Sequence, residues 1–225
     1  MMQRVKIGSV LLLTLCGIVG TVSAARVVLP PATTAAGYVC RLLINEVPFP
    51  GEKGYRSEAD TIIAMNSLLH VLDSRLRYVP PPYSQQNVAA VSTRNIVDII
   101  TAGGARGQFE GFFRDAAGRL AMAPRVTERI NNLVTIASQG QPGKFSRLLT
   151  HAVTIATNYT QSRFSEPNLH ASLQQVGPLP VTGRAYSWMT DETRFRPGGN
   201  FVRIPDQDSG SLGGNRFFTL RKDPK

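Results

Sequence analysis

Apolar side chains recur every three or four positions in five segments of the chain, a spacing that places them on one face of an α-helix. The clearest segment covers residues 57–77, where Ser57 and Asp60 resemble a capping box and three prolines follow at 80–82. The other four segments span about 38–47, 92–102, 124–138 and 144–159. The pattern predicts a core of packed amphipathic helices.

The pattern changes after residue 159. Residues 160–215 are rich in Pro, Gly, Ser and Asn, so loops should dominate there. Short extended pieces are expected at Val181, Tyr186–Met189 and Phe201–Ile204, and a closing strand at Phe217–Leu220. We therefore predict a mainly α protein with a small β element, an α+β fold with a loop-rich C-terminal part.

The first 24 residues have the features of a secretory signal peptide. Arg4 and Lys6 precede an apolar stretch that ends in the small-residue sequence Val22-Ser23-Ala24. The alternative, an uncleaved membrane anchor, fits less well because the stretch is short for a membrane span. The expected organisation is a signal peptide at 1–24, a linker at 25–37, one domain at 38–220 and a frayed tail at 221–225.

The chain is strongly basic. Its 225 residues include 25 Lys and Arg against 15 Asp and Glu, a formal net charge of +10. Cleavage near Ala24 would remove two basic residues, leaving 23 positive against 15 negative side chains and a net charge of +8. We expect a secreted or periplasmic protein that is not inserted in the membrane after cleavage. Its partners should be anionic polymers of the cell wall rather than nucleic acid.

Metal and cofactor chemistry have no support in the sequence. His70, His151 and His170 lack a second ligand three or four residues away, and there is no phosphate-binding glycine loop or G-x-S-x-G motif. Cys16 lies in the predicted signal peptide, so Cys40 has no internal disulfide partner and is expected to be a small buried helix residue. We predict neither a metal nor a cofactor.

Glu46 is the most informative residue. It shares a helix face with Val39, Leu42 and Leu43 at the spacing i, i+3, i+4, i+7. Desolvation on such a face raises the pKa of a carboxyl, which could then act as a general acid near neutral pH. The alternative is that Glu46 caps or pairs at the end of a helix that stops at Pro48, where it reaches water.

Aromatic residues cluster in a glycine-flanked loop at 106–115, where Phe109 follows the amide of Gln108. Aromatic faces beside amides suit the binding of sugar rings. The alternative is that these phenylalanines fill the core beneath the loop. The same two interpretations apply to Tyr186 and Trp188.

Three stretches follow one another in an order and spacing that resemble one family. The first stretch is Leu42 to Glu46, followed by Gly51-Glu52 and by an apolar helix that ends near Arg75. The second is Gly107-Gln108-Phe109, which follows the third predicted helix. The third, near the end of the chain, is Gly214-Asn215-Arg216-Phe217-Phe218. Together they resemble the cell-wall hydrolases named for the spore-cortex-lytic enzymes of sporulating bacteria. These act on peptidoglycan glycan strands as lytic transglycosylases.

The resemblance implies a lysozyme-like or lytic-transglycosylase-like helical core. It also implies that Glu46 is the general acid and base that cleaves between N-acetylmuramic acid and N-acetylglucosamine, with peptidoglycan glycan strands as the substrate. The residues expected to bind this substrate are Gln108, Phe109, Tyr186, Trp188 and Asn215.

Two departures from the family pattern keep alternatives open. Two extra residues separate Glu46 from Glu52, and Arg216 replaces a histidine of the closing motif. A hydrolytic variant would use a second carboxylate to activate water, and the candidates are Glu52, Glu110 and Asp191. The other alternative is a secreted, non-catalytic cell-wall-binding or effector protein that retains the fold.

Overall fold

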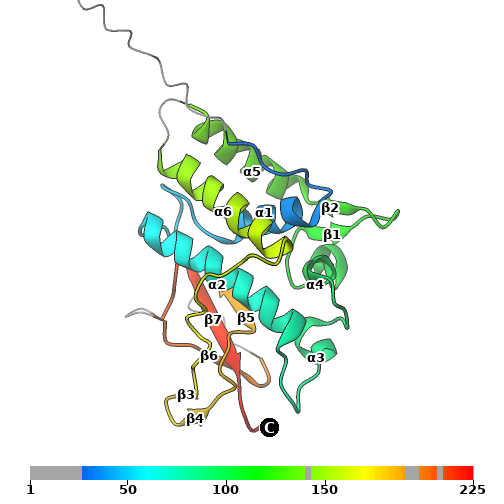
Figure 1. The fold of residues 1–225 in the computed structure, drawn as a ribbon, viewed down its shortest axis with the longest axis vertical. Helices are drawn as coiled ribbons and strands as arrows, with labels where there is room; N and C mark the ends of the chain where they lie inside the picture. The colour runs from blue at the N-terminus through cyan, green and yellow to red at the C-terminus, as the bar shows by residue number, and fades with distance from the viewer. Residues whose placement is uncertain (1–26, 140–142, 191–197, 207–209, 225) are drawn as a thin grey trace, which may run out of the picture.

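The computed structural model describes residues 27–139, 143–190, 198–206 and 210–224. The helices are α1 (Ala35–Glu46), α2 (Glu58–Arg77), α3 (Gln85–Ala89), α4 (Ile96–Thr101), α5 (Pro124–Ala137) and α6 (Lys144–Thr160), with a 3-10 helix η1 (Gly104–Arg106). The strands are β1 (Phe112–Arg114), β2 (Leu120–Met122), β3 (Gln175–Val176), β4 (Leu179–Pro180), β5 (Ser187–Thr190), β6 (Phe201–Arg203) and β7 (Asn215–Leu220). Helices and small sheets together form the predicted α+β class, with the helices predominant (Figure 1).

Helix α1 lies at the centre of the helical part and packs against α2, α4, α5 and α6. It starts at Ala35, three residues earlier than predicted, because the Thr34 side chain caps it by accepting a hydrogen bond from the Gly37 backbone N–H. Residues 35–37, assigned to a linker from the sequence, are therefore its first turn. Its last residue is Glu46.

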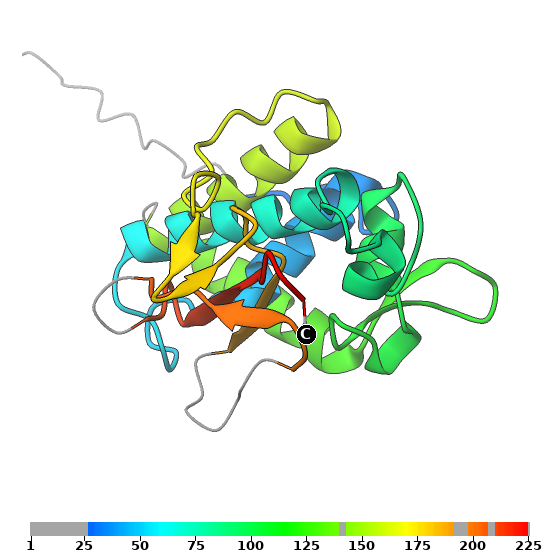
Figure 2. The ribbon, with the colours of Figure 1, turned by 90° about the horizontal axis from the view of Figure 1, so that it is seen from below.

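Helix α2 separates the other long helices from the three-stranded sheet (Figure 1). Ser57 caps it as predicted, accepting from the Asp60 backbone N–H at 3.1 Å. The helix ends at Arg77, and its buried face contacts α6, α4 and α1 on one side and β5 on the other. Figure 2, viewed from below, shows the strands in front of α2.

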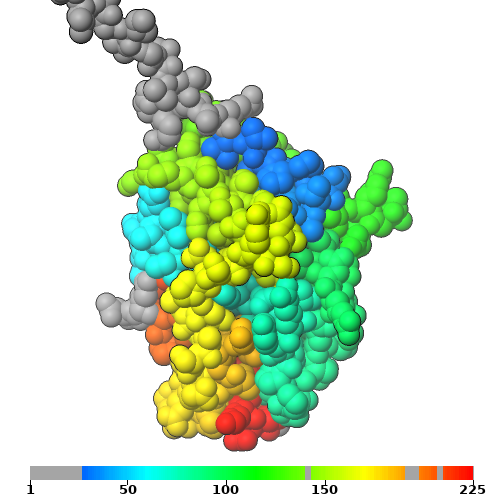
Figure 3. All heavy atoms as spheres, in the orientation of Figure 1, coloured from blue at the N-terminus to red at the C-terminus, as the bar shows by residue number. Residues whose placement is uncertain are grey.

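Helices α5 and α6 match their predicted ranges closely. Pro124 occupies the first turn of α5, where its missing N–H leaves no hydrogen bond unmade. The buried faces of the two helices pack together and against α1. The segment that follows α6 crosses over α2 toward the sheet, as the yellow surface in Figure 3 shows. The carbonyl of Glu166 in this segment is 2.9 Å from His70 Nε2 on α2.

Local capping and turns account for the differences from prediction between residues 84 and 122. The predicted helix at 92–102 shortens to α4 because Asn95 caps it, its side chain accepting from the Val97 N–H. The short helix α3, capped by Ser84, was not predicted. Nor was the β1–β2 hairpin, whose turn is held by the Asp115 carboxylate through two backbone N–H groups.

The three-stranded antiparallel sheet has the order β5-β7-β6, with Trp188 opposite Phe217 and Thr190 opposite Asn215. All six residues of β7 are buried. Residues 221 and 222, assigned to a frayed tail from the sequence, are held in place, because the Arg221 and Lys222 N–H groups donate to the carbonyls of Asn200 and Pro180. Within the described ranges, none of the helices combines the length and apolar character needed to cross a bilayer.

Candidate functional site

Glu46 is held by contacts from two strands of the sheet and from its own helix. Its Oε2 accepts a hydrogen bond from Trp188 Nε1 on β5 at 2.9 Å, and its Oε1 accepts one from Asn45 Nδ2 at 3.1 Å. The Asn215 Nδ2 of β7 donates to the Glu46 backbone carbonyl at 2.7 Å. The carboxyl at the end of α1 therefore has a fixed position and orientation.

Burial raises the pKa of the Glu46 carboxyl above its ordinary value. The hydrogen bonds from Trp188 and Asn45 and the charges of Arg129 and Arg125 act in the opposite direction, because they stabilise the carboxylate. The side chain still lines open cavities. The predicted desolvation of Glu46 is thus present at a position that a ligand can reach.

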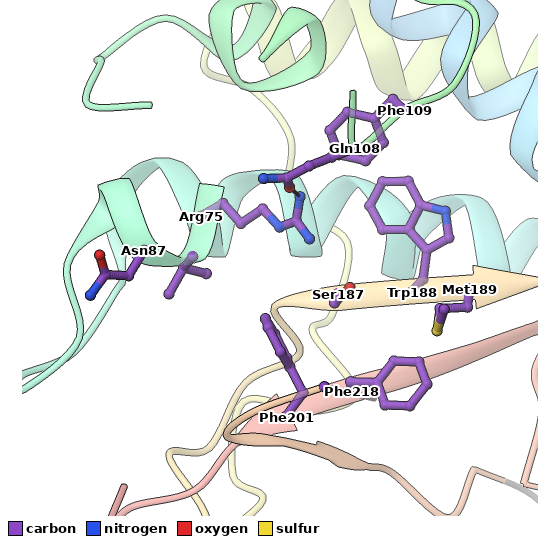
Figure 4. A pocket seen from close by; sticks show the side chains of 11 residues that line it. Arg75, Asn87, Gln108, Phe109, Ser187, Trp188, Met189, Phe201 and Phe218 are labelled. Carbon is purple, nitrogen blue, oxygen red and sulfur yellow. Dashed lines mark hydrogen bonds between the residues drawn. The ribbon is translucent and has the colours of Figure 1, made fainter. Parts of the chain in front are cut away.

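Three adjoining cavities form what we call the Glu46 groove. Glu46 lines two of them, with volumes of about 510 and 370 Å³. The larger of these shares Gln108, Phe109 and Trp188 with a third cavity of about 360 Å³, shown in Figure 4 and named the Arg75 cavity. Because neighbouring cavities share wall residues, the groove continues on both sides of Glu46.

An aromatic and cationic cluster forms the wall between Glu46 and the Arg75 cavity. The rings of Phe109 and Trp188 stack with centroids 4.8 Å apart, and the Arg75 guanidinium lies 5.3 Å from the Phe109 centroid. Arg75 also donates to the side-chain oxygen of Gln108 (Figure 4). Its Nε donates to the Tyr186 carbonyl. Glu46, Trp188, Phe109 and Arg75 thus form one contiguous set of side chains.

Two glycines allow Gln108 and Phe109 to reach this wall. Gly103 has φ of +83°, a conformation that other residues rarely adopt. A Cβ on Gly107 would lie 2.1 Å from the Ala102 carbonyl oxygen, so only glycine permits this close approach of the backbone. The chain after α4 therefore folds back tightly and presents Gln108 and Phe109 to the groove.

Four of the five predicted sugar-binding residues lie at the groove: Gln108, Phe109, Trp188 and Asn215. Asn215 is buried, and its amide is used to hold the Glu46 carbonyl. The structure corrects the expectation for Tyr186. Its side chain is 1% exposed and donates to the Tyr78 carbonyl at 2.9 Å, so it does not line the groove.

Two of the three predicted second carboxylates are bound to arginines. Glu52 accepts from Arg129 through both oxygens, at 2.9 and 2.5 Å, and lines the 370 Å³ cavity. Glu110 lines the 510 Å³ cavity and pairs with Arg125 at 2.8 Å, and both side chains are more than half exposed. Asp191 lies outside the described residues.

Two arginines are more important to the site than the sequence indicated. Arg129 donates to the Ile44 and Val47 carbonyls and so ties the C-terminal end of α1 to α5. Arg75 sits three residues after Leu72 on the buried face of α2. An arginine at a core position of an amphipathic helix is the signal that could have found it.

Cys40, His170 and Arg216 do not line the Glu46 groove. Burial raises the pKa of the Cys40 thiol to about 12, which keeps it protonated and unreactive. His170 forms a largely buried pair with Asp206 at 2.7 Å and packs near Phe217. Arg216 is buried opposite Met189 on the sheet. Among the described residues, no cluster of three or more His, Cys, Asp or Glu side chains could hold a metal.

Comparison with protein-family models, curated proteins and solved structures gives no match to this chain. The chemistry of the Glu46 groove is therefore the basis for a functional assignment.

Proposed function

We propose that the protein cleaves the glycan strand of peptidoglycan as a lytic transglycosylase with a lysozyme-like helical core, and that Glu46 is its general acid and base. The observation that carries this proposal is the Glu46 carboxyl: its pKa is raised by burial, and it opens into a long groove with aromatic and amide side chains. A glycan strand is an extended polymer that fits a groove continuing on both sides of the reacting bond.

In the first step, protonated Glu46 donates its proton to the glycosidic oxygen between N-acetylmuramic acid and N-acetylglucosamine. The bond between C1 of the muramyl ring and this oxygen breaks, and the proton remains on the leaving oxygen. Trp188 and Asn45 each bind one carboxyl oxygen and hold the carboxyl plane in place. The charges of Arg125 and Arg129 stabilise the carboxylate that forms.

In the second step, the Glu46 carboxylate takes a proton from the C6 hydroxyl of the same muramyl residue. The C6 oxygen then attacks C1 of the same ring. The product therefore ends in a 1,6-anhydro ring, and Glu46 is protonated again. This route needs no second carboxylate nucleophile, in contrast to ordinary retaining glycosidases. A route without a second carboxylate is consistent with the ion pairs of Glu52 and Glu110, which bind Arg129 and Arg125.

The side chains that line the groove would bind the substrate. The Gln108 side chain is exposed and can bind an N-acetyl or hydroxyl group. The rings of Phe109 and Trp188 are largely buried in the core but line the cavity, where they offer a sugar ring a narrow apolar contact. Met189 and Thr190, which follow Trp188 on β5, line the same cavity.

One second candidate function is favoured by a specific observation, the buried Arg216 at the position of a family histidine. In this alternative the protein binds cell-wall polymer without cleaving it, through exposed groove arginines such as Arg125. Both functions share one groove and differ in whether Glu46 performs chemistry.

Digestion of purified peptidoglycan, followed by mass spectrometry of the fragments, separates the two. The unmodified protein should release anhydro-muropeptides and Glu46→Gln should release none. Glu110→Gln, which changes a second carboxylate in the same cavity, is the matched control and should retain activity. Salt-sensitive pelleting of the protein with cell walls, without glycan cleavage at any pH, would favour the binding function.

A further inference from the structure

Arg75 is a deeply buried cation. The residue is only 4% exposed. Burial lowers the pKa of the Arg75 guanidinium to about 10, so the group remains charged at neutral pH. Across the described ranges no carboxylate forms a salt bridge with it. A buried guanidinium without an anionic partner is costly, and an incoming anion would offset that cost.

The groups around Arg75 fix its guanidinium but use only part of it. Nε donates to the Tyr186 carbonyl at 2.5 Å, and Nη1 donates to the Gln108 side chain. A guanidinium carries five N–H groups in a planar fork that matches a carboxylate. In Figure 4 it lies at the cavity wall between Gln108 and Ser187.

The rest of the Arg75 cavity fits a sugar. Phe201, Phe218 and Met189 supply apolar surface, and Asn87 supplies a second amide in addition to that of Gln108. The volume of about 360 Å³ is near the lower end of the range for small-ligand sites. This volume is enough for one substituted sugar ring.

The cavity is coupled to the reacting carboxyl through Trp188. The indole N–H of Trp188 binds Glu46, and its ring lies 6.0 Å from the Arg75 guanidinium. A sugar seated in the Arg75 cavity would therefore neighbour the bond that Glu46 protonates.

We propose that the Arg75 cavity binds the free lactyl carboxylate of N-acetylmuramic acid, and that the preferred substrate is glycan whose stem peptide has been removed at that residue. This inference rests on the proposed function. A lactyl group that still carries its peptide is a neutral amide and gives the Arg75 fork no charge to bind. The reaction that supplies the substrate is amide hydrolysis, in which water splits the lactyl amide into a carboxylate and an amine.

The fluorescence of Trp188 provides the test, because it is the single tryptophan of the chain and lines the cavity. The full-length protein is titrated with N-acetylmuramic acid, its methyl ester, N-acetylglucosamine and muramyl dipeptide. The free acid should bind saturably and about tenfold or more tightly than each of the others, because a charge-assisted hydrogen bond is lost in them. Equal binding of acid and ester, tighter binding of the dipeptide, or no saturable signal with the acid would overturn the proposal.

Variants locate the effect. Arg75→Gln should bind acid and ester equally, and Arg75→Lys should keep part of the preference because it retains charge without the fork. Arg77→Gln changes an exposed arginine on the same helix and should behave as the parent. Circular dichroism checks that each variant is folded. If the Arg75 variants do not fold, the comparison of free acid with methyl ester in the parent protein alone tests the proposal.

The two proposals can fail separately. Glu46→Gln should still prefer the free acid even though it no longer cleaves glycan. Acid preference without cleavage by the parent would refute the proposed function and support the Arg75 site. Cleavage of intact and amidase-treated peptidoglycan at equal rates, without acid preference, would refute the Arg75 site alone.

Discussion

The indole Nε1 of Trp188 donates a hydrogen bond to Glu46 Oε2 at 2.9 Å, across 142 residues of sequence. The bond joins the end of α1 to strand β5 and connects the proposed acid to the aromatic wall of the groove. It stabilises the ionised carboxyl, while burial favours the protonated form.

Replacing Trp188 with Phe removes the N–H donor and keeps an aromatic ring. The pKa of Glu46 should rise further, because the carboxylate loses a stabilising hydrogen bond. Since the first step requires protonated Glu46, the alkaline limb of the kcat/KM profile should move to higher pH, and kcat should fall by about tenfold or more as the carboxyl loses its orientation. An alkaline limb at the parent's position would contradict this role of Trp188. Phe109→Leu alters the same wall without touching the carboxyl and should leave the limb unmoved.

Glu46 should make the protein less stable as pH rises. Its pKa is raised in the folded state, so the folded protein holds more protons than the unfolded chain between the ordinary pKa of a glutamate and the raised one. Glu46→Gln should therefore unfold at higher urea concentration than the parent at neutral pH, with the difference vanishing at acidic pH below both values. Glu110→Gln, at an exposed site, should show no such gain. A parent that matches Glu46→Gln at all pH values would refute the desolvation of this carboxyl.

Asn215→Ala should lower kcat more than it changes KM. The Asn215 side chain is buried and its amide donates to the backbone carbonyl of Glu46, so its loss should misplace the acid with little effect on ground-state binding. The lost buried hydrogen bond should also reduce the free energy of unfolding by about 1–3 kcal/mol. Steady-state kinetics and urea denaturation measure the two effects. A change confined to KM would assign Asn215 to substrate binding instead.

Arg129→Met should destabilise the fold by about 2 kcal/mol in urea denaturation. Its guanidinium binds Glu52 and two carbonyls at the end of α1, and hydrogen bonds to a charged group contribute more than neutral ones. Arg125→Gln on the same helix is the matched control, since exposed ion pairs contribute little. Equal stability of the two variants would show that Arg129 does not hold α1 in place.

The sequence pattern predicts the helices well because their stability depends on local periodicity and caps. Ser57 and Pro124 mark helix starts that the structure retains. The desolvation of Glu46 follows from its place on the apolar face of α1, which is also a local property.

What the sequence could not supply depends on long-range packing. Tyr186 and Trp188 are two residues apart and were both candidates for sugar binding. Tertiary contacts bury Tyr186, whose hydroxyl donates to the Tyr78 carbonyl, and bring the Trp188 indole N–H to Glu46. The importance of Arg75 follows from its burial between Phe109 and the Tyr186 carbonyl, which come from distant segments. The β1–β2 hairpin depends on a turn whose side-chain bonds override a weak strand pattern.

Mass spectrometry of glycan fragments released in water labelled with heavy oxygen tests the central claim most directly. We predict that the parent releases chains with unlabelled 1,6-anhydro ends, because the muramyl C6 oxygen rather than water attacks C1, and that Glu46→Gln releases none. Equal release by Glu46→Gln, or reducing ends that carry the heavy oxygen, would contradict the assignment of Glu46 as the single acid and base of a transglycosylase.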